Sequence, residues 1–119
     1  MLDDLPLITG QHLIGGTWVT SENTFDSSPA TGDYESFYAG GMDEINEAVT
    51  AAEAAFAVYS QTTRAERAAF LEKIAEEIEA RGPGLTAVAS AETGLPPARL
   101  EGERGRTCGQ LKLFAQHIR

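Results

Sequence analysis

The sequence predicts an α+β fold, in which a β-hairpin and a strand precede three or four amphipathic helices. Two observations predict it. Short strand-like runs flank turn-forming glycines in the first third of the chain, as in strands joined by tight turns. After residue 42, apolar residues recur at every third or fourth position, as they do along one face of a helix. We therefore divide the chain into a hairpin and strand segment, residues 1–41, and a helical segment, residues 42–119.

The hairpin is expected within residues 11–19. Leu13-Ile14 and Trp18-Val19 form its two strand-like runs, and Gly15-Gly16 supplies the positive φ angles that a tight turn needs. A second turn, Pro29-Ala-Thr-Gly32, leads into a strand that contains Tyr34, Phe37 and Tyr38. Both segments are too short to be stable alone, so they need another element to pack on.

The first helix is expected from Met42. Its apolar face is formed by Ile45, Ala48, Val49, Ala52, Phe56 and Tyr59. A second helix begins at Thr63-Arg-Ala-Glu66, which has the pattern of a capping box, and its apolar side contains Phe70, Leu71, Ile74, Ala75 and Ile78. Gly82-Pro83-Gly84 ends or kinks this helix, and residues 85–91 resume it until Thr93-Gly94.

The last helix begins near Pro97 and continues to Arg119. Proline is accepted in a first helical turn because its missing N–H costs no hydrogen bond there. No Gly, Asn or Pro stop signal follows, and Leu111, Phe114 and Ile118 still recur at helical spacing. From this pattern we expect a piece of a larger fold, whose remaining polypeptide covers the apolar face.

Composition bounds the class of protein. The 119 residues are 42% apolar, as in a globular domain. The formal net charge of −9 argues against binding to nucleic acid or to anionic membranes, because both require a basic surface. The single cysteine cannot form an internal disulfide, and Asp3 and Asp4 stand where a secretory signal would be basic. No apolar run reaches membrane-spanning length, so we expect a cytoplasmic protein.

Few motifs carry chemistry. The sequence has no GxGxxG, no GxxxxGK followed by Ser or Thr, no HExxH and no CxxC. His12 and His117 lie far apart in sequence, and we assign both to structural or surface roles. Cys108 has Arg104 and Arg106 nearby, which can lower a thiol pKa, so a thiol enzyme is one hypothesis. A small cysteine within a helical turn favours a buried structural role instead.

Charged residues gather on two of the expected helices. The carboxylates of the second helix, Glu72, Glu76, Glu77 and Glu79, share one solvated side and offer no contrasting pair for acid–base catalysis. The last helix has a polar stripe of Arg99, Glu103, Arg106 and Gln110 beside an apolar stripe of Leu100, Thr107, Leu111, Phe114 and Ile118. The polar stripe is either an exposed Arg99–Glu103 pair or a rim that binds an anionic small molecule through an arginine fork.

Several segments, taken in order, resemble the start of an aldehyde dehydrogenase. They are Leu13-Ile-Gly-Gly-Thr-Trp-Val19, Thr24-Phe25, Ser28-Pro-Ala-Thr-Gly32, Ala51-Ala-Glu-Ala-Ala-Phe56, Arg64-Ala-Glu-Arg67 with Phe70-Leu71, and Glu92-Thr-Gly94. The resemblance extends from about residue 8 to the end. The segments Leu95-Pro-Pro-Ala-Arg-Leu100, Gly102-Glu-Arg-Gly-Arg-Thr107 and Gly109-Gln-Leu-Lys-Leu-Phe114 are most similar to the branch that uses NADP to oxidise 2-oxoglutarate semialdehyde. A fatty-aldehyde branch shares part of that signature.

The resemblance implies an α/β aldehyde dehydrogenase fold for the full-length protein, with residues 42–119 as the first part of its NAD(P)-binding domain. It implies NADP or NAD as cofactor, a small-molecule aldehyde as substrate, and a homo-oligomer. The family's catalytic, nucleotide-binding and oligomerisation residues all lie downstream of the region present here. Cys108 precedes Gly109-Gln110, whereas the family's nucleophile follows a Gly-Gln pair. We therefore expect no catalytic or cofactor-binding residue in this chain, and neither activity nor bound cofactor from it alone.

The resemblance also implies which residues face substrate. In the family, the helix that matches residues 97–119 borders the aldehyde entrance tunnel. The tunnel candidates are therefore Glu103, Arg106 and Thr107, and Arg106 suits an aldehyde that carries a carboxylate. Some relatives hold a structural cation at positions that match the Asp26-Ser27 loop and Glu92, but we assign no metal site here.

An alternative of a different class is a stand-alone, non-catalytic α+β interaction module. It would expose the apolar stripe of its last helix as a binding surface. The intact mass and the reading frame after codon 119 distinguish this alternative from a region of a longer enzyme.

Overall fold

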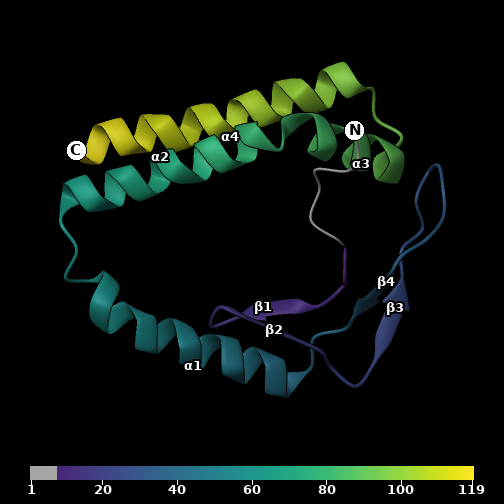
Figure 1. Cartoon of the computed structure of the whole chain (residues 1–119), viewed down its shortest axis with the longest axis horizontal. Coiled ribbons are helices and arrows are strands. Elements are labelled where there is room, and N and C mark those ends of the chain that lie inside the picture. Colours follow the sequence, from purple (N-terminus) through teal and green to yellow (C-terminus); the bar gives the residue numbers. More distant parts are fainter. Residues whose placement is uncertain (1–7) are drawn as a thin grey trace. The chain divides into compact units, whose positions relative to one another are not determined.

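The computed structural model describes residues 8–119, which form an α+β structure of four helices and two small antiparallel sheets (Figure 1). Residues 1–7, with Asp3 and Asp4, lie outside the described part. The described residues form two compact units. One contains the residues up to Ser28 together with Asp33–Gln61, and the other contains Pro29–Gly32 and Thr62–Arg119. The sequence-based division at residue 41 concerns the domains of a longer protein and stays a prediction.

The first sheet is the expected hairpin. Strands β1 (His12–Ile14) and β2 (Thr17–Val19) pair antiparallel, with Leu13 opposite Trp18. Gly15 and Gly16 have φ angles of +59° and +80°, the left-handed conformations that a two-residue hairpin loop requires. The prediction from the glycine pair is confirmed.

The second sheet corrects the sequence analysis. Strands β3 (Thr24–Asp26) and β4 (Ser36–Tyr38) pair antiparallel, with the rings of Phe25 and Phe37 stacked at a centroid distance of 5.8 Å. The sequence pattern predicts a single strand that includes Tyr34, whereas Tyr34 precedes β4. Only one apolar residue marks β3, so its pairing depends on a partner strand that local patterning does not reveal.

Helix α1 (Met42–Tyr59) begins where the sequence analysis expected. The Glu44 side chain accepts a hydrogen bond from the backbone N–H of Gly41 at 2.8 Å, which satisfies one free donor at the helix start. Within its unit the helix packs against β1. Its expected apolar face is nevertheless largely open, since Val49 and Phe56 are 62% and 67% exposed.

Helix α2 (Arg64–Ala80) starts at the predicted capping box. The Thr63 hydroxyl accepts from the N–H of Glu66 at 3.2 Å, and the Glu66 carboxylate accepts from the N–H of Thr63 at 2.7 Å. These reciprocal bonds hold the pKa of Glu66 below its usual range, because both the Thr63 backbone and its side chain bind the charged form.

Helix α3 (Gly82–Thr93) begins three residues earlier than residue 85, where the sequence analysis resumed the helix. Pro83 lies in the first turn of α3, where a proline is tolerated, so the Gly-Pro-Gly segment starts this helix as well as ending the previous one. Gly94, with φ of +74°, ends α3 in the left-handed conformation.

The carboxyl end of α3 is capped by a turn from far earlier in the chain. The backbone N–H groups of Ala30 and Thr31 donate to the carbonyl oxygens of Glu92 and Ala91 at 3.1 and 3.0 Å. The last carbonyls of a helix have no partner within it, so this predicted Pro29–Gly32 turn satisfies two groups that would otherwise need water.

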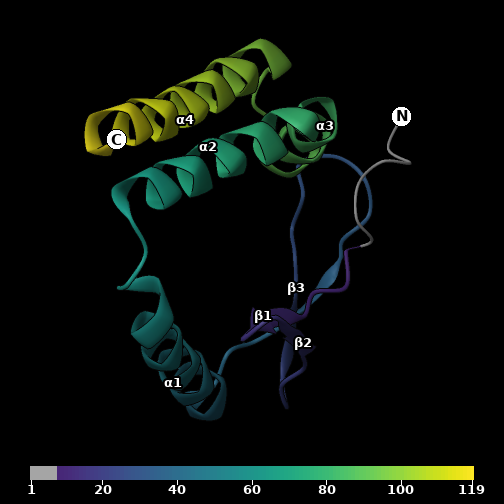
Figure 2. The same ribbon diagram turned by 60° about the vertical axis from the view of Figure 1, so that its left-hand side comes forward.

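Helix α4 (Pro97–Ile118) runs antiparallel along α2, and the two stay side by side in both views (Figures 1 and 2). Their contact is a seam of small residues, each at most 1% exposed: Ala68 and Ala75 on α2, and Cys108 and Ala115 on α4. Both pairs are spaced by seven residues, which is two helical turns. No helix in the described part is long and apolar enough to cross a membrane.

The seam differs from the apolar side predicted for α2. Of the predicted residues, Ala75 is fully buried, whereas Phe70 is 54% exposed. Small side chains let two helix backbones approach closely, and this leaves the larger residues beside the contact instead of within it. Periodicity identified the helix correctly but not which of its residues contact α4.

Replacing Ala75 with leucine should destabilise the chain by about 1–3 kcal/mol, because the seam has no room for a larger side chain. The matched control is Ala69→Leu, an exposed position on the same helix, where we expect a change within about 0.5 kcal/mol. Urea unfolding followed by circular dichroism measures both. Equal effects at the two positions would contradict the seam.

Candidate functional site

Two of the three tunnel candidates lie in one groove. Glu103 and Thr107 line an open groove of about 200 Å³ formed by α3, α4 and the end of α2. Its other lining residues are Ile78, Leu85, Thr86, Ala89, Leu100 and Arg104. Arg106 belongs to the same turn of α4 but does not line the groove. The structure therefore brings two candidates together and places the third beside them.

The polar groups of Glu103 and Thr107 already have partners within α4. The Glu103 carboxylate accepts from Nε of Arg99 at 3.2 Å, and the Thr107 hydroxyl donates to the carbonyl oxygen of Glu103 at 3.0 Å. Both members of the Arg99–Glu103 pair are more than half exposed, so the pair contributes only about 0.3–0.5 kcal/mol. The first interpretation of the polar stripe, an exposed ion pair, is confirmed for these two residues.

Arg106 differs from Arg99. Its side chain is exposed and, among residues 8–119, has no hydrogen-bond or ion-pair partner. A guanidinium without a partner keeps all five donors for an external anion, and its planar fork matches a carboxylate. The second interpretation of the stripe, a rim for an anionic small molecule, therefore depends on Arg106.

Arg104 is the residue that the sequence analysis missed in this groove. Its Nη1 donates to the Thr86 hydroxyl at 2.8 Å, and its Nε lies 3.4 Å from a carboxylate oxygen of Glu79. The sequence pattern identifies Arg104 only as a neighbour of Cys108. Two residues of α3, Gly82 and Thr86, lie against the Arg104 side chain. The sequence alone does not show this contact, because it forms only where α3 packs against α4.

Cys108 is a seam residue and not an exposed nucleophile. Its Sγ donates a weak hydrogen bond to the carbonyl oxygen of Ala75 at 3.7 Å. Burial raises the pKa of the Cys108 thiol, and the Glu79 carboxylate raises it further, against smaller opposing effects of Lys112 and Arg104. A buried thiol with a raised pKa remains protonated, which argues against the thiol-enzyme hypothesis.

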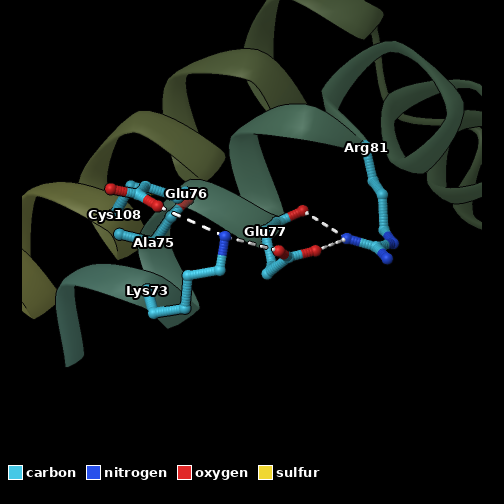
Figure 3. Close-up of polar contacts among 6 residues, drawn as sticks. All are labelled: Lys73, Ala75, Glu76, Glu77, Arg81 and Cys108. Atoms are coloured by element: carbon cyan, nitrogen blue, oxygen red, sulfur yellow. Dashed lines mark hydrogen bonds and ion pairs between the residues drawn. The ribbon is translucent and has the colours of Figure 1, made fainter. Parts of the chain in front are cut away.

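A second groove extends along α2 and shares Ile78 and Leu85 with the first. It measures about 520 Å³, and its lining combines Phe70, Ile74, Ile78 and Leu85 with Lys73, Glu77 and Arg81. The three charged residues form a row along the helix (Figure 3). The Glu77 carboxylate lies 2.9 Å from Nζ of Lys73 and also accepts from the Arg81 guanidinium.

This row accounts for part of the acidic cluster on α2. The hydrogen bond from Arg81 and the nearby Lys73 lower the pKa of Glu77 to about 2, and Glu77 in turn raises the pKa of Lys73. Glu72 pairs with Arg119 and Glu79 with Arg104. Each of these carboxylates has a cationic partner, so their arrangement is that of helix ion pairs and not of a catalytic acid and base.

The remaining candidates are dispersed. His12 lines a groove between β1 and α1, and its buried Nε2 has no hydrogen-bond partner in the described part of the chain. His117 lies in the last turn of α4. Asp26 accepts from the Ser36 hydroxyl at 2.5 Å, and the Ser27 hydroxyl accepts from the N–H of Glu35 at 3.0 Å.

The described residues contain no group of three or more His, Cys, Asp or Glu side chains that could hold a metal ion. Glu92 contacts the Pro29–Gly32 turn through its backbone carbonyl oxygen, which accepts a hydrogen bond from the N–H of Ala30. The assignment of no metal site stays a prediction.

The comparisons with known proteins define the class. Residues 18–119 match the aldehyde dehydrogenase family, and the chain belongs to this family. It is 44% identical to the alpha-ketoglutaric semialdehyde dehydrogenase of Acinetobacter baylyi over 92% of its own length, and 45% identical to alpha-ketoglutaric semialdehyde dehydrogenase 2 of Azospirillum brasilense over 94%. It is 33% identical to the NADP(+) succinate-semialdehyde dehydrogenase 2 of Schizosaccharomyces pombe over 88%. The chain spans 22% of each of these relatives.

The ion pairs of Glu77 with Lys73 and Arg81 should make the free energy of unfolding depend on pH in the acid range. The folded-state pKa of Glu77 is about 2, below its ordinary value of 4.5, so the stabilisation is present above pH 4.5 and is lost as pH falls towards 2. We expect the Glu77→Gln variant to lose less stability over this range than the wild type. Urea unfolding at several pH values measures the difference.

The control is Glu101→Gln on α4, which removes an exposed carboxylate that has no ion-pair partner in the described region. It should leave the acid dependence of the wild type in place. If Glu77→Gln shows the same acid dependence as this control, the row does not contribute.

Proposed function

We propose that this chain is the N-terminal region of an NAD(P)-dependent aldehyde dehydrogenase that oxidises 2-oxoglutarate semialdehyde to 2-oxoglutarate. The observation that carries the proposal is the identity of 44% and 45% to two alpha-ketoglutaric semialdehyde dehydrogenases, compared with 33% to an enzyme named for succinate semialdehyde. The reaction combines aldehyde, water and oxidised nicotinamide cofactor to give carboxylate, reduced cofactor and two protons. We propose NADP as the cofactor, the cytoplasm as the location, and a homo-oligomer as the assembly.

We assign the cofactor-binding site to the part of the full-length protein that lies outside this chain. The groove on α4 measures about 200 Å³ and its Glu103, Arg104 and Thr107 side chains are already paired, so it does not fit a nicotinamide dinucleotide. We propose that residues 42–119 form the first part of the NAD(P)-binding domain and that the catalytic and oligomerisation segments lie outside this chain. The nicotinamide supplies the hydride acceptor when it is bound.

The role of this chain is to recognise substrate. We propose that Glu103, Arg106 and Thr107 face the passage through which the aldehyde enters, with Arg106 binding the distant carboxylate. Within residues 8–119 the Arg106 guanidinium has no ion-pair partner, which supports this role, because binding a carboxylate there breaks no ion pair among them. Glu103 limits the number of anionic groups that the same turn accepts, because like charges repel.

Two other functions remain as alternatives. Within the family, a fatty-aldehyde dehydrogenase shares part of the sequence signature, and its substrate would need no cation at Arg106. A stand-alone interaction module is favoured by one observation, the open apolar face of α1 with Val49 and Phe56 more than 60% exposed. A reading frame that stops after codon 119 would support the module, and one that continues into a nucleotide-binding loop would support the enzyme.

We expect the full-length enzyme to oxidise 2-oxoglutarate semialdehyde with a higher kcat/KM than propanal, which lacks the carboxylate. The 119-residue chain alone should give no turnover, because the nucleophile, base and cofactor loop are assigned elsewhere. Formation of reduced cofactor at 340 nm measures both. Turnover by purified chain of confirmed mass would overturn the assignment, and a preference for long-chain aldehydes would favour the fatty-aldehyde alternative.

The Arg106→Ala variant of the full-length enzyme should raise KM for the semialdehyde about tenfold, since one charge-assisted interaction is lost. Its KM for propanal should stay unchanged. The matched control is Lys112→Ala, which removes an exposed cation from the same helix without touching the groove. An equal KM for the semialdehyde in the Arg106→Ala enzyme and the wild type would remove Arg106 from substrate binding.

A further inference from the structure

Arg104 is a groove residue held by two other helices. Its side chain is 22% exposed, whereas that of Arg99, five residues earlier, is 63% exposed. The guanidinium donates to Thr86 of α3, which is itself only 7% exposed, and pairs with Glu79 near the end of α2. One side chain therefore ties α4 to both of the helices that complete the groove.

The site is shaped for this guanidinium. Gly82 at the start of α3 is buried, and a Cβ atom there would lie 2.7 Å from Cζ and 3.0 Å from Nε of Arg104. That separation is shorter than any carbon contact allows, so any side chain at residue 82 would displace the guanidinium. Gly82 provides the space, and Thr86, one turn later on α3, provides the acceptor.

The position of Arg104 on α4 connects these contacts with substrate recognition. Arg104 follows Glu103 directly, and Thr107 lies one turn later; all three line the groove. We propose that Arg104 is a positioning residue, which fixes this turn of α4 through Thr86 and Glu79 so that Arg106 meets the substrate carboxylate. The inference rests on the function proposed above, in which this turn faces the aldehyde.

The chain contains a second ion pair of the same kind that serves as a control. Arg119 lies 2.6 Å from Glu72 and also ties α4 to α2, but at the opposite end of the helix pair. Neither residue lines the groove. Removing this pair weakens the contact between α2 and α4 but keeps the bonds of Arg104 to Thr86 and Glu79.

The experiment compares four variants of the full-length enzyme. Thr86→Val removes the acceptor at nearly constant volume, and Thr86→Ser retains it. Gly82→Ala displaces the guanidinium while leaving Thr86 and Arg104 in the sequence. Arg119→Gln is the control. For each variant, KM and kcat are measured with 2-oxoglutarate semialdehyde and with propanal, together with Tm.

We expect Thr86→Val and Gly82→Ala to raise KM for the semialdehyde roughly five- to tenfold, because misplacing a binding group weakens recognition. Their kcat and their KM for propanal should stay within about twofold of wild type. Thr86→Ser and Arg119→Gln should retain the wild-type KM for both substrates. If Thr86→Val does not fold, Gly82→Ala decides the outcome.

A lower Tm with an unchanged KM for the semialdehyde in both Thr86→Val and Gly82→Ala would overturn the inference and leave Arg104 a structural residue. An equal rise in KM for both aldehydes would also overturn it, because the effect would not depend on the carboxylate. A wild-type enzyme that does not oxidise the semialdehyde contradicts the proposed function and the inference together. These failures are therefore distinguishable.

Discussion

The close contact of α2 with α4 depends on four small residues, and the rest of the helical unit is arranged around it. Ala68 and Ala75 face Cys108 and Ala115, and every one of them is at most 1% exposed. Cys108 of α4 contacts Ala75 of α2. Arg104, four residues earlier on α4, pairs with Glu79, four residues later on α2, so both contacts belong to one antiparallel register. This register brings Arg104 within reach of Thr86, so the geometry of the groove follows from a constraint on side-chain volume.

Local rules predicted the elements well because each has a local cause. Paired glycines predicted the first hairpin, and the Thr63 and Glu66 side chains predicted the start of α2. The same rules failed where the cause is distant in sequence. Strand β3 exists through its pairing with β4, and the burial of Ala75 in preference to Phe70 reflects the approach of another helix.

In the candidate site, too, the sequence predicted some residues and missed those whose partners are distant in sequence. The resemblance of the sequence to a family placed Glu103, Arg106 and Thr107 on one helix, and the structure places them on one turn, with two of them in a groove. Neither source predicted Arg104, because its partners come from two other helices and its space depends on a glycine. Side-chain positions were likewise needed to show that Arg99 is paired whereas Arg106 has no partner in the described part of the chain.

The backbone cap at the end of α3 has a consequence for how the chain folds. The capping turn at Ala30 and Thr31 is separated from Ala91 and Glu92 by about half of the chain length, so the cap can close only after the intervening helices have been synthesised. Closing so long a loop is entropically costly and slows formation of the contact. The last turn of α3 should therefore be among the late segments to gain protection from hydrogen exchange. A protein that lacks the Pro29–Gly32 turn would keep the last turn of α3 frayed even with every helix residue present.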